Sequence, residues 1–356
     1  MGPAPQLSVA LSVRRLSIPV SVNFISQKTD KEGMGTETGS GESTALSPDE
    51  AFTVLGNETR LQILRTLGTA DEPLAFSELF DRVDYDDSSN FGYHLEQLVG
   101  HFVSKTDEGY DLWKAGERVV ESVLSGAITD DPVVDPTTID DSCPFCPADL
   151  QVAYQQERVE FHCNECSGVG TGGYKESGKD RFESHGTLGY LLLPPAGIQE
   201  RTASEVVEAA EHWTATQAYA LARGVCPRCS ARIAFSPRVC EDHTDANKRC
   251  EQCDLRFAAM FSANCTNCIF DMDAPVAIYL GKHPAVMGFM IEHDIDPTSP
   301  EGYGFAVFDA AESVLSTDPL KVRITYTLDN NSLAVTVDEA LSVVDVTRDD
   351  VTTLHG

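Results

Sequence analysis

The sequence lacks the features that mark several large classes of protein. It contains no run of the roughly 18 consecutive apolar residues that a membrane-spanning helix requires. It also contains no H-E-x-x-H pair of metal-binding histidines, no G-x-S-x-G nucleophile elbow and no glycine-rich phosphate loop. We therefore expect a protein that neither enters a membrane nor catalyses a reaction.

Basic residues are scarce in most of the chain. Lysine and arginine together number 26 against 56 aspartates and glutamates, which gives a net charge of −30. After residue 33 the ratio is 22 to 54, and acids are in excess in every long segment. A uniformly acidic surface keeps proteins dissolved in concentrated salt. The composition therefore indicates a halophilic source.

The first 45 residues differ in composition from the rest. Residues 1–33 carry four basic and two acidic side chains, and residues 33–44 are almost entirely glycine, serine, threonine and glutamate. Such a segment has little apolar surface to bury. We expect residues 1–45 to be a disordered extension or the product of a mis-assigned start, with Met34 as the alternative first residue.

Residues 46–126 show a series of helix signals followed by a hairpin. Ser47 opens one helix, Asn57 caps a second, Pro73 precedes a third, and Ser88 or Ser89 caps a fourth. Two short strands then flank the turn at 107–109, and apolar residues in 115–124 recur at helical spacing. This order predicts a winged helix-turn-helix domain over 46–126.

The fourth predicted helix occupies the place of a recognition helix, whose first residues meet bases and phosphates in the major groove. Small hydroxyl and amide groups can approach base edges there, and aromatic hydroxyl or ring nitrogen groups can donate to phosphates. The predicted DNA contacts are Ser88, Ser89, Asn90, Gly92, Tyr93 and His94 on this helix and Lys105 in the wing.

The charge of this domain opposes DNA binding. Residues 46–126 contain 6 basic and 16 acidic side chains, a net of −10, whereas DNA-binding domains usually present a basic face. In molar salt the Debye length falls to about 3 Å, so long-range repulsion is screened. Affinity would then depend on short hydrogen bonds and shape.

Cysteines are arranged in pairs. Eleven cysteines form five Cys-x-x-Cys pairs and one single residue, and such pairs direct two thiolates toward one point. This arrangement favours metal binding over disulfides and indicates the cytoplasm. Cys143, Cys146, Cys163 and Cys166 have the spacing of a zinc ribbon, and alternating apolar residues between the pairs predict a hairpin.

A second cluster contains eight candidate ligands, enough for two tetrahedral sites. They are Cys226, Cys229, Cys240, His243, Cys250, Cys253, Cys265 and Cys268. The spacing favours two consecutive modules, with the first four residues at one ion and the last four at the other. A crossed pairing, in which Cys226/Cys229 and Cys250/Cys253 share an ion, stays open. Because four protein ligands close each site, we expect three structural Zn²⁺ ions in total.

The second cluster lies in a segment that is not acidic. Residues 226–268 carry six basic and five acidic side chains. These basic residues either contact nucleic acid or an acidic protein, or balance the charge of the seven thiolates. We favour charge balance.

The remaining segments complete an α+β, multi-domain chain. We expect a linker at 127–142, a zinc ribbon with its following segment at 143–200, and a connecting helix at 201–225. The double zinc-binding module should span 226–270. An α+β unit at 271–356 is expected to contain helices at 284–293 and 303–315, then two or three strands.

Several stretches resemble a known family, the ArsR-like winged-helix regulators. They are LGNETRLQIL from Leu55, SNFGYHLEQL in the fourth helix, and YDLWKAGERVV after the wing. The order of the cysteine pairs and the motifs HPAVMGF and HDID, between His283 and Asp296, resemble larger haloarchaeal members with a cysteine-rich C-terminal half. The resemblance covers nearly all of 46–348 and implies a cytoplasmic, homodimeric transcriptional regulator that binds duplex DNA.

Metal sensing does not follow from this resemblance. Metal-sensing members of the family carry inducer-binding cysteines on or beside the winged helix, and residues 46–126 contain no cysteine. We expect a DNA-binding regulator whose zinc-stabilised half dimerises, binds a protein partner or senses a signal. The alternative is a module that binds proteins or RNA through its winged helix and zinc ribbons, without sequence-specific DNA binding.

Overall fold

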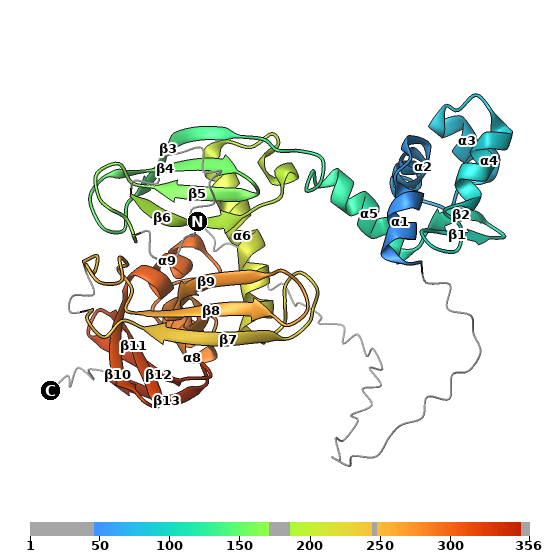
Figure 1. Ribbon diagram of the computed structural model, residues 1–356. Coiled ribbons are helices and arrows are strands. Elements are labelled where there is room, and N and C mark those ends of the chain that lie inside the picture. The colour runs from blue at the N-terminus through green and yellow to red at the C-terminus, as the bar shows by residue number, and fades with distance from the viewer. Residues whose placement is uncertain (1–45, 171–185, 244–247, 350–356) are drawn as a thin grey trace, which may run out of the picture. The chain divides into compact units, whose positions relative to one another are not determined.

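The computed structural model describes residues 46–170, 186–243 and 248–349. The chain divides into the units 1–45 and 46–356, and the predictions for 1–45 and Met34 lie outside the described residues. Within the described ranges the protein is of mixed α+β type, with four small antiparallel sheets (Figure 1). No helix of these ranges is both long and apolar enough to cross a bilayer.

Residues 46–126 contain five helices and one hairpin. The elements are α1 (Pro48–Leu55), α2 (Glu58–Gly68), α3 (Phe76–Val83), α4 (Ser88–Glu96), β1 (Val103–Thr106), β2 (Gly109–Leu112) and α5 (Lys114–Leu124). The predicted caps Ser47 and Asn57 are confirmed, because each side chain accepts a backbone N–H of the first helical turn. The order predicted for these elements is also confirmed.

The cap of α4 differs from the prediction. The carboxylate of Asp87 accepts the backbone amides of Ser89 at 2.9 Å and Asn90 at 3.2 Å. Asp87 is therefore the N-cap, and the prediction of Ser88 or Ser89 is wrong. A carboxylate is favoured here because it also interacts with the positive end of the helix dipole.

One core fixes these helices and the hairpin together. Ile63 of α2 and Phe91 of α4 are 0% exposed and belong to the same cluster of buried residues. Leu74 exchanges two backbone hydrogen bonds with Tyr110 of β2, at 3.0 and 2.9 Å. Gly109 has a φ of 138°, and a Cβ there would lie 2.6 Å from the carbonyl oxygen of Leu74. Only glycine fits this approach of the hairpin to the chain before α3.

A four-stranded antiparallel sheet follows. Its strands, in spatial and sequence order, are β3 (Val134–Ser142), β4 (Asp149–Gln155), β5 (Arg158–His162) and β6 (Thr187–Leu192). The predicted hairpin between the first two cysteine pairs is confirmed as β4 and β5. The predicted linker at 127–142 is wrong over its second half, since residues 134–142 pair with β4. Ile139 is 5% exposed, and burial of its side chain outweighs the turn-forming prolines and aspartates around it.

The long helix α6 (Ala203–Ala222) confirms the predicted connecting helix and follows the short 3-10 helix η1 (Pro195–Ile198). Thr202 caps α6 and forms a capping box with Glu205. Val207 of α6 packs in the core of the β3–β6 sheet, whereas Leu221 belongs to the next core. Helix α6 therefore contributes to two cores. In Figure 1 it runs along the β3–β6 sheet and then along the sheet formed by residues 233–275.

The last part of the chain contains two further sheets and three helices. They are β7 (Ile233–Val239), β8 (Ala259–Cys265), β9 (Asp271–Pro275), α7 (Val276–Leu280), α8 (Pro284–Glu292), α9 (Pro300–Phe308), β10 (Ala310–Thr317), β11 (Leu320–Leu328), β12 (Asn331–Asp338) and β13 (Val343–Asp349). Strands β7–β9 form one antiparallel sheet and β10–β13 the other. Phe261 of β8, Phe289 of α8 and Tyr326 of β11 are 0% exposed in one common core. The predicted boundary between 270 and 271 therefore crosses both a sheet and a core.

One predicted helix is too long. The sequence predicts a helix over 303–315, but α9 ends at Phe308 and residues 310–317 form β10. These residues alternate between half-buried and exposed positions and pair with β11. Their alternating burial suits a strand, and hydrogen bonding to β11 stabilises that strand. Together these two effects outweigh the helical propensity of the residues.

Candidate metal centres and the exposed face of helix α4

The polar residues of α4 form one exposed face. Ser88, Ser89, Asn90 and Tyr93 are exposed, with 59% of Tyr93 accessible to solvent. Helical spacing places Ser89, Asn90 and Tyr93 on the side opposite the buried Phe91, whereas Ser88 is exposed as the first residue of the helix. Four of the six predicted contacts on α4 are therefore available to a partner.

Three of the predicted contacts already have neighbours within the protein. The side-chain amide of Asn90 donates to the hydroxyl of Tyr85 at 2.7 Å. The half-buried ring of His94 lies edge-on to Tyr85, and burial lowers the pKa of His94, which keeps it neutral. The ammonium of Lys105 lies 3.7 Å from the carboxylate of Glu96. Gly92 is half-buried and adds no functional group.

The N-terminus of α4 is acidic. Asp84 and Asp86 precede the N-cap Asp87, whose carboxylate already occupies the first free amides of the helix. A phosphate cannot take the same amides at the same time. The amides of Ser89 and Asn90 are therefore not available to a nucleic acid, whose contacts with α4 would come mainly from side chains. Tyr85 and Asp87 are the residues that sequence reasoning missed here, although an Asp three residues before Asn90 is a readable cap signal.

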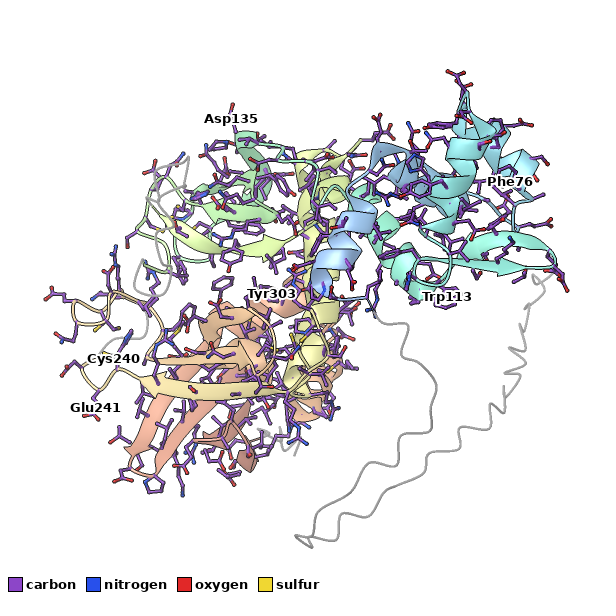
Figure 2. The ribbon with its side chains drawn as sticks, turned by 45° about the vertical axis from the view of Figure 1, so that its right-hand side comes forward. Phe76, Trp113, Asp135, Cys240, Glu241 and Tyr303 are labelled. Carbon is purple, nitrogen blue, oxygen red and sulfur yellow. The ribbon has the colours of Figure 1, made fainter. Side chains whose placement is uncertain are left out.

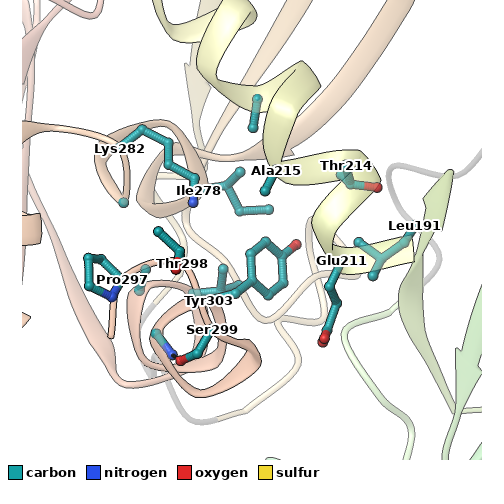
Figure 3. Close-up of a pocket in the computed structure, with 15 residues that line it drawn as sticks. Leu191, Glu211, Thr214, Ala215, Ile278, Lys282, Pro297, Thr298, Ser299 and Tyr303 are labelled. Carbon is teal, nitrogen blue, oxygen red and sulfur yellow. Dashed lines mark hydrogen bonds between the residues drawn. The ribbon is translucent and has the colours of Figure 1, made fainter. Parts of the chain in front are cut away.

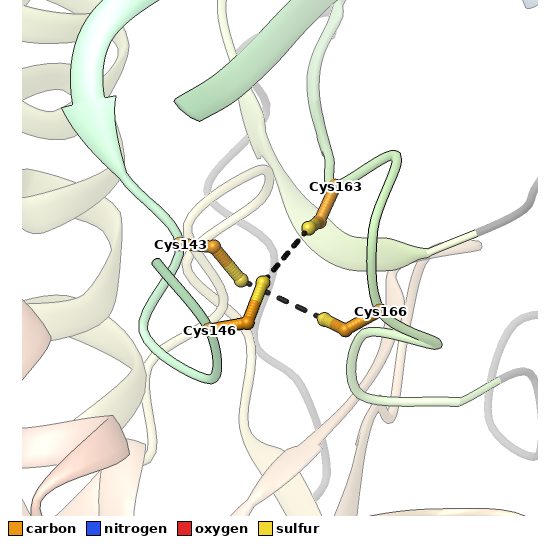
Figure 4. Close-up of side chains that lie close together, drawn as sticks. All are labelled: Cys143, Cys146, Cys163 and Cys166. Atoms are coloured by element: carbon orange, nitrogen blue, oxygen red, sulfur yellow. Dashed lines mark hydrogen bonds between the residues drawn. The ribbon is translucent and has the colours of Figure 1, made fainter. Parts of the chain in front are cut away.

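The first cysteine cluster forms a compact tetrad (Figure 4). Cys143 follows β3, Cys163 follows β5, and the loops after them carry Cys146 and Cys166. The Sγ atoms of Cys143 and Cys166 are 3.7 Å apart, and those of Cys146 and Cys163 are 3.5 Å apart. A tetrahedral ion with metal–sulfur distances of about 2.3 Å requires sulfurs about 3.8 Å apart. The tetrad could hold a metal ion.

Backbone amides stabilise negative charge on these sulfurs. The N–H groups of Phe145 and Gly168 donate to Cys143 and Cys166, at 3.4 and 3.5 Å. Burial raises the pKa of Cys143 to about 12. Burial acts in the same direction on Cys163, but backbone hydrogen bonds outweigh it and lower the pKa of Cys163 to about 7. One thiolate therefore forms near neutral pH, and a metal can deprotonate the others.

The remaining eight ligands form two tetrads whose composition corrects both expected pairings. One tetrad consists of Cys226, Cys229, Cys265 and Cys268, and the other of Cys240, His243, Cys250 and Cys253. We call them the outer and the inner tetrad. In each, the ligand atoms lie within 4.8 Å of one another, so each could hold a metal ion.

The register of one hairpin explains this nesting. Strands β7 and β8 are antiparallel, with Ile233 opposite Cys265 and Val239 opposite Ala259. The chain before β7 and the chain after β8 therefore meet at one end of the hairpin, where they form the outer tetrad. At the other end of the hairpin, residues 240–258 connect β7 to β8, and this connection contains the inner tetrad. Figure 2 shows Cys240 and Glu241 at that end.

Within each of the two tetrads, the distances between ligand atoms are those expected around a single metal ion. In the outer tetrad the Sγ atoms of Cys226 and Cys268 are 3.7 Å apart. In the inner tetrad the Sγ of Cys253 lies 3.6 Å from Nδ1 of His243. Hydrogen bonding from the backbone amide of Ala231 is the main cause that lowers the pKa of Cys229, to about 6.

The excursion at 240–258 is tied to the rest of the fold at its base. The carboxylate of Glu312 on β10 accepts the amides of Ala258 at 2.6 Å and Ala259 at 3.0 Å. Burial raises the pKa of Glu312 to about 7. The guanidinium of Arg256 donates to the carbonyl of Gly168 at 2.5 Å, beside the first tetrad.

Several basic residues of 226–268 have partners inside the protein. Arg238 lies 2.7 Å from Asp273, and Arg249 donates to Asp254 at 2.5 Å. Arg256 stacks over the ring of Phe145 at 4.2 Å. At least half of the six basic side chains are therefore engaged in intramolecular contacts, which weakens the interpretation of this segment as a nucleic-acid surface.

Two double variants distinguish the three pairings. Cys226→Ser with Cys265→Ser removes two ligands of the outer tetrad alone, so native mass spectrometry should find two metal ions where we expect three in the unaltered chain. Cys226→Ser with Cys250→Ser affects both tetrads, and one ion should remain. Consecutive modules predict one ion for the first variant, and the crossed pairing predicts two for the second.

Comparisons with known proteins gave two family matches. The model of a domain of unknown function, DUF7347, matches residues 48–123, and that of another domain of unknown function, DUF7351, matches residues 140–343. No curated protein and no solved structure matches the chain. The first match covers α1 to most of α5, and the second extends from within β3 to the start of β13.

Proposed function

Because the chain belongs to the DUF7351 family, whose description carries no activity, we propose a function from the arrangement of its own residues. The proposed function is that of a transcriptional regulator of the ArsR-like type. Residues 46–126 act as a winged helix-turn-helix that reads duplex DNA, and three structural Zn²⁺ ions stabilise a C-terminal half that dimerises, binds a protein partner or senses a signal.

The exposed face of α4 carries the proposal. Helices α2 and α3 and the β1–β2 hairpin share one core with α4, while Ser89, Asn90 and Tyr93 are exposed on the opposite side of α4. A helix presented in this way can enter the major groove with its polar face toward the bases. The short hydroxyl groups allow close approach, and the phenol of Tyr93 can donate to a phosphate.

The composition of the tetrads supports zinc as the metal. Each tetrad provides four ligands, which are cysteine sulfurs and, in the inner tetrad, one histidine nitrogen. Tetrahedral sites of cysteine with histidine are typical of structural Zn²⁺. Four protein ligands leave no coordination position for water or substrate, so these ions would stabilise the fold and supply no catalysis.

The ionic strength of the solution determines how strongly the acidic residues 46–126 are repelled by DNA. At about molar salt the screening length is near 3 Å, which leaves only contacts at van der Waals or hydrogen-bond distance. The exposed groups of α4 act at that range. A homodimer would present α4 twice, so the DNA site should be a two-fold symmetric pair of half-sites.

A second function, binding of a protein or RNA partner without sequence-specific DNA contacts, is favoured by one observation. Three acidic residues, Asp84, Asp86 and Asp87, lie within four positions before α4, and Asp87 caps the helix. An acidic helix N-terminus opposes phosphate, whereas it suits a basic peptide.

Selection of bound fragments from genomic DNA of the source organism separates these two functions. In about molar KCl, the unaltered protein should enrich one two-fold symmetric motif. The triple variant Ser89→Ala, Asn90→Ala and Tyr93→Ala removes the exposed groups of α4 and should lose that motif.

The control for this selection is the metal content and melting temperature of the triple variant, which should equal those of the unaltered protein. Gln62→Ala, an exposed substitution on α2, should leave the selected motif unchanged. Enrichment of the same motif by the triple variant, or of no motif by the unaltered protein, would refute DNA reading by α4.

A further inference from the structure

A large, partly open cavity lies among residues 141–308. Its volume is about 730 Å³, and its walls come from the β3–β6 sheet, α6, strands β8 and β9, and α9. Binding sites for small molecules usually have about 300–1,000 Å³. A narrower pocket adjoins it, and Leu191, Glu211, Thr214 and Tyr303 line both (Figure 3).

The walls of the cavity are mainly apolar and aromatic. Eight aromatic side chains line it, among them Phe161 on β5, Phe270 before β9, Tyr279 on α7 and Tyr303 on α9. Walls of this kind favour the apolar body of a ligand and attract a cation through their ring faces.

The charged groups of the cavity all have one sign. Asp141, Glu211, Asp271 and Asp273 line it, and none of the described lining residues is a lysine, arginine or histidine. Clusters of acids are common on this acidic protein, so the environment of each carboxylate decides which one matters.

Among these carboxylates, Glu211 is the one with a buried oxygen, Oε2, that accepts no hydrogen bond from the described residues. Burial first, then the charges of Asp141 and Glu208, raise the pKa of Glu211 to about 7. A buried acceptor without a partner destabilises the protein, and a ligand that supplies the partner removes this cost.

Two basic side chains near the cavity, Arg238 and Lys282, contact residues other than Glu211. Asp273 already binds Arg238 at 2.7 Å. Lys282 lines the narrow pocket, but its ammonium lies over the ring of Tyr219, 5.1 Å from the ring centroid.

We propose that this cavity binds a lipophilic organic cation, with its apolar body against the aromatic walls and its charge toward the carboxylate of Glu211. If residues 46–126 read DNA as proposed, this cation is the signal that the C-terminal half senses. The binding itself does not depend on DNA, so it can be tested without it.

Two ions of equal shape and opposite charge test the proposal. Tetraphenylphosphonium and tetraphenylborate differ in charge alone, and calorimetric titration of the zinc-loaded full chain should be done in sodium chloride, because potassium precipitates the borate. At about pH 8, one unit above the pKa of Glu211, the carboxylate is ionised. The phosphonium should bind one to one and at least about 10-fold more tightly than the borate, a difference of about 1.4 kcal/mol.

Glu211→Gln keeps the shape of the side chain and removes its charge. It should weaken phosphonium binding about 10-fold and leave the affinity for the borate equal or higher. Glu208→Gln, an exposed change on the same helix, should alter neither affinity by more than about two-fold. Ala218→Leu narrows the cavity without a change in charge and should weaken the binding of both ions.

Three results would overturn the proposal. They are failure of a folded, three-metal protein to bind the phosphonium, equal affinities for the two ions, and unchanged phosphonium affinity in folded Glu211→Gln. If Glu211→Gln does not fold, unchanged binding in Ala218→Leu has the same meaning. None of these results bears on the DNA selection, which tests α4 alone.

Discussion

Loss of the metal from the outer tetrad is expected to unfold the core that contains β8, while the first and the inner tetrads can still bind their ions. Cys265 is the last residue of β8, and Phe261 and Ala263 of that strand are 0% exposed in the core shared with β11 and β12. Structural Zn²⁺ sites provide apparent binding free energies of about 10–16 kcal/mol, which is comparable to the entire stability of a domain. Cys265→Ser should therefore abolish cooperative melting of this core.

The two tryptophans allow this effect to be measured separately in each half. Trp213 lies on α6 and Trp113 precedes α5. In a Trp113→Phe background, the fluorescence of Trp213 should show no cooperative transition after Cys265→Ser. In a Trp213→Phe background, Trp113 should melt as in the unaltered protein.

The inner tetrad supplies the matched control for Cys265→Ser. Cys250→Ser also removes one metal, but its tetrad lies in the excursion 240–258 and not on a core strand. This variant should retain the transition reported by Trp213, with a lower melting temperature. Equal melting of Cys265→Ser and the unaltered protein would show that β8 is stable without the metal.

Phe91→Ala is expected to be the most damaging single substitution in residues 46–126. Phe91 is 0% exposed, and its ring contacts those of Phe76, Phe80 and Tyr85 at centroid distances of 5.6, 5.2 and 6.0 Å. Truncation of a buried phenylalanine costs about 3–5 kcal/mol, much of the stability of a small domain. Urea denaturation followed by Trp113 fluorescence should show this loss.

Tyr93→Ala is the control from the same helix. Tyr93 is 59% exposed, so its truncation should change the free energy of unfolding by less than about 0.5 kcal/mol. A loss of equal size in the two variants would contradict the division of α4 into a buried and an exposed face. The triple variant used for DNA selection would then report on folding rather than recognition.

Local signals predicted the helices of residues 46–126 well. The caps at Ser47 and Asn57 depend on hydrogen bonds within four residues, so the sequence contains all that determines them. The cap of α4 was harder to assign because Asp86, Asp87, Ser88 and Ser89 are adjacent and each is a good cap residue. The choice depends on where the buried positions of α4 begin.

Distant partners decide the features that the sequence did not predict. Strand β3 exists because β4 offers it a partner, although its own residues favour turns. The composition of each tetrad depends on the register of β7 with β8, since consecutive, crossed and nested pairings all fit the same spacings. The burial of the carboxylate of Glu211, whose Oε2 has no partner among the described residues, results from the packing of α6 against elements as distant along the chain as α9.

The nested tetrads also differ in the chain entropy that metal binding must overcome. From first to last ligand the inner tetrad joins Cys240 to Cys253, 13 residues apart, whereas the outer tetrad joins Cys226 to Cys268, 42 residues apart. Closing the longer loop costs roughly 1 kcal/mol more in an unfolded chain, by the logarithmic dependence on loop length. The inner ligands can therefore gather around an ion while β7 and β8 are still separate. The outer ligands meet only once that hairpin has paired, so we expect the metal sites to fill from the tip of the hairpin toward its base.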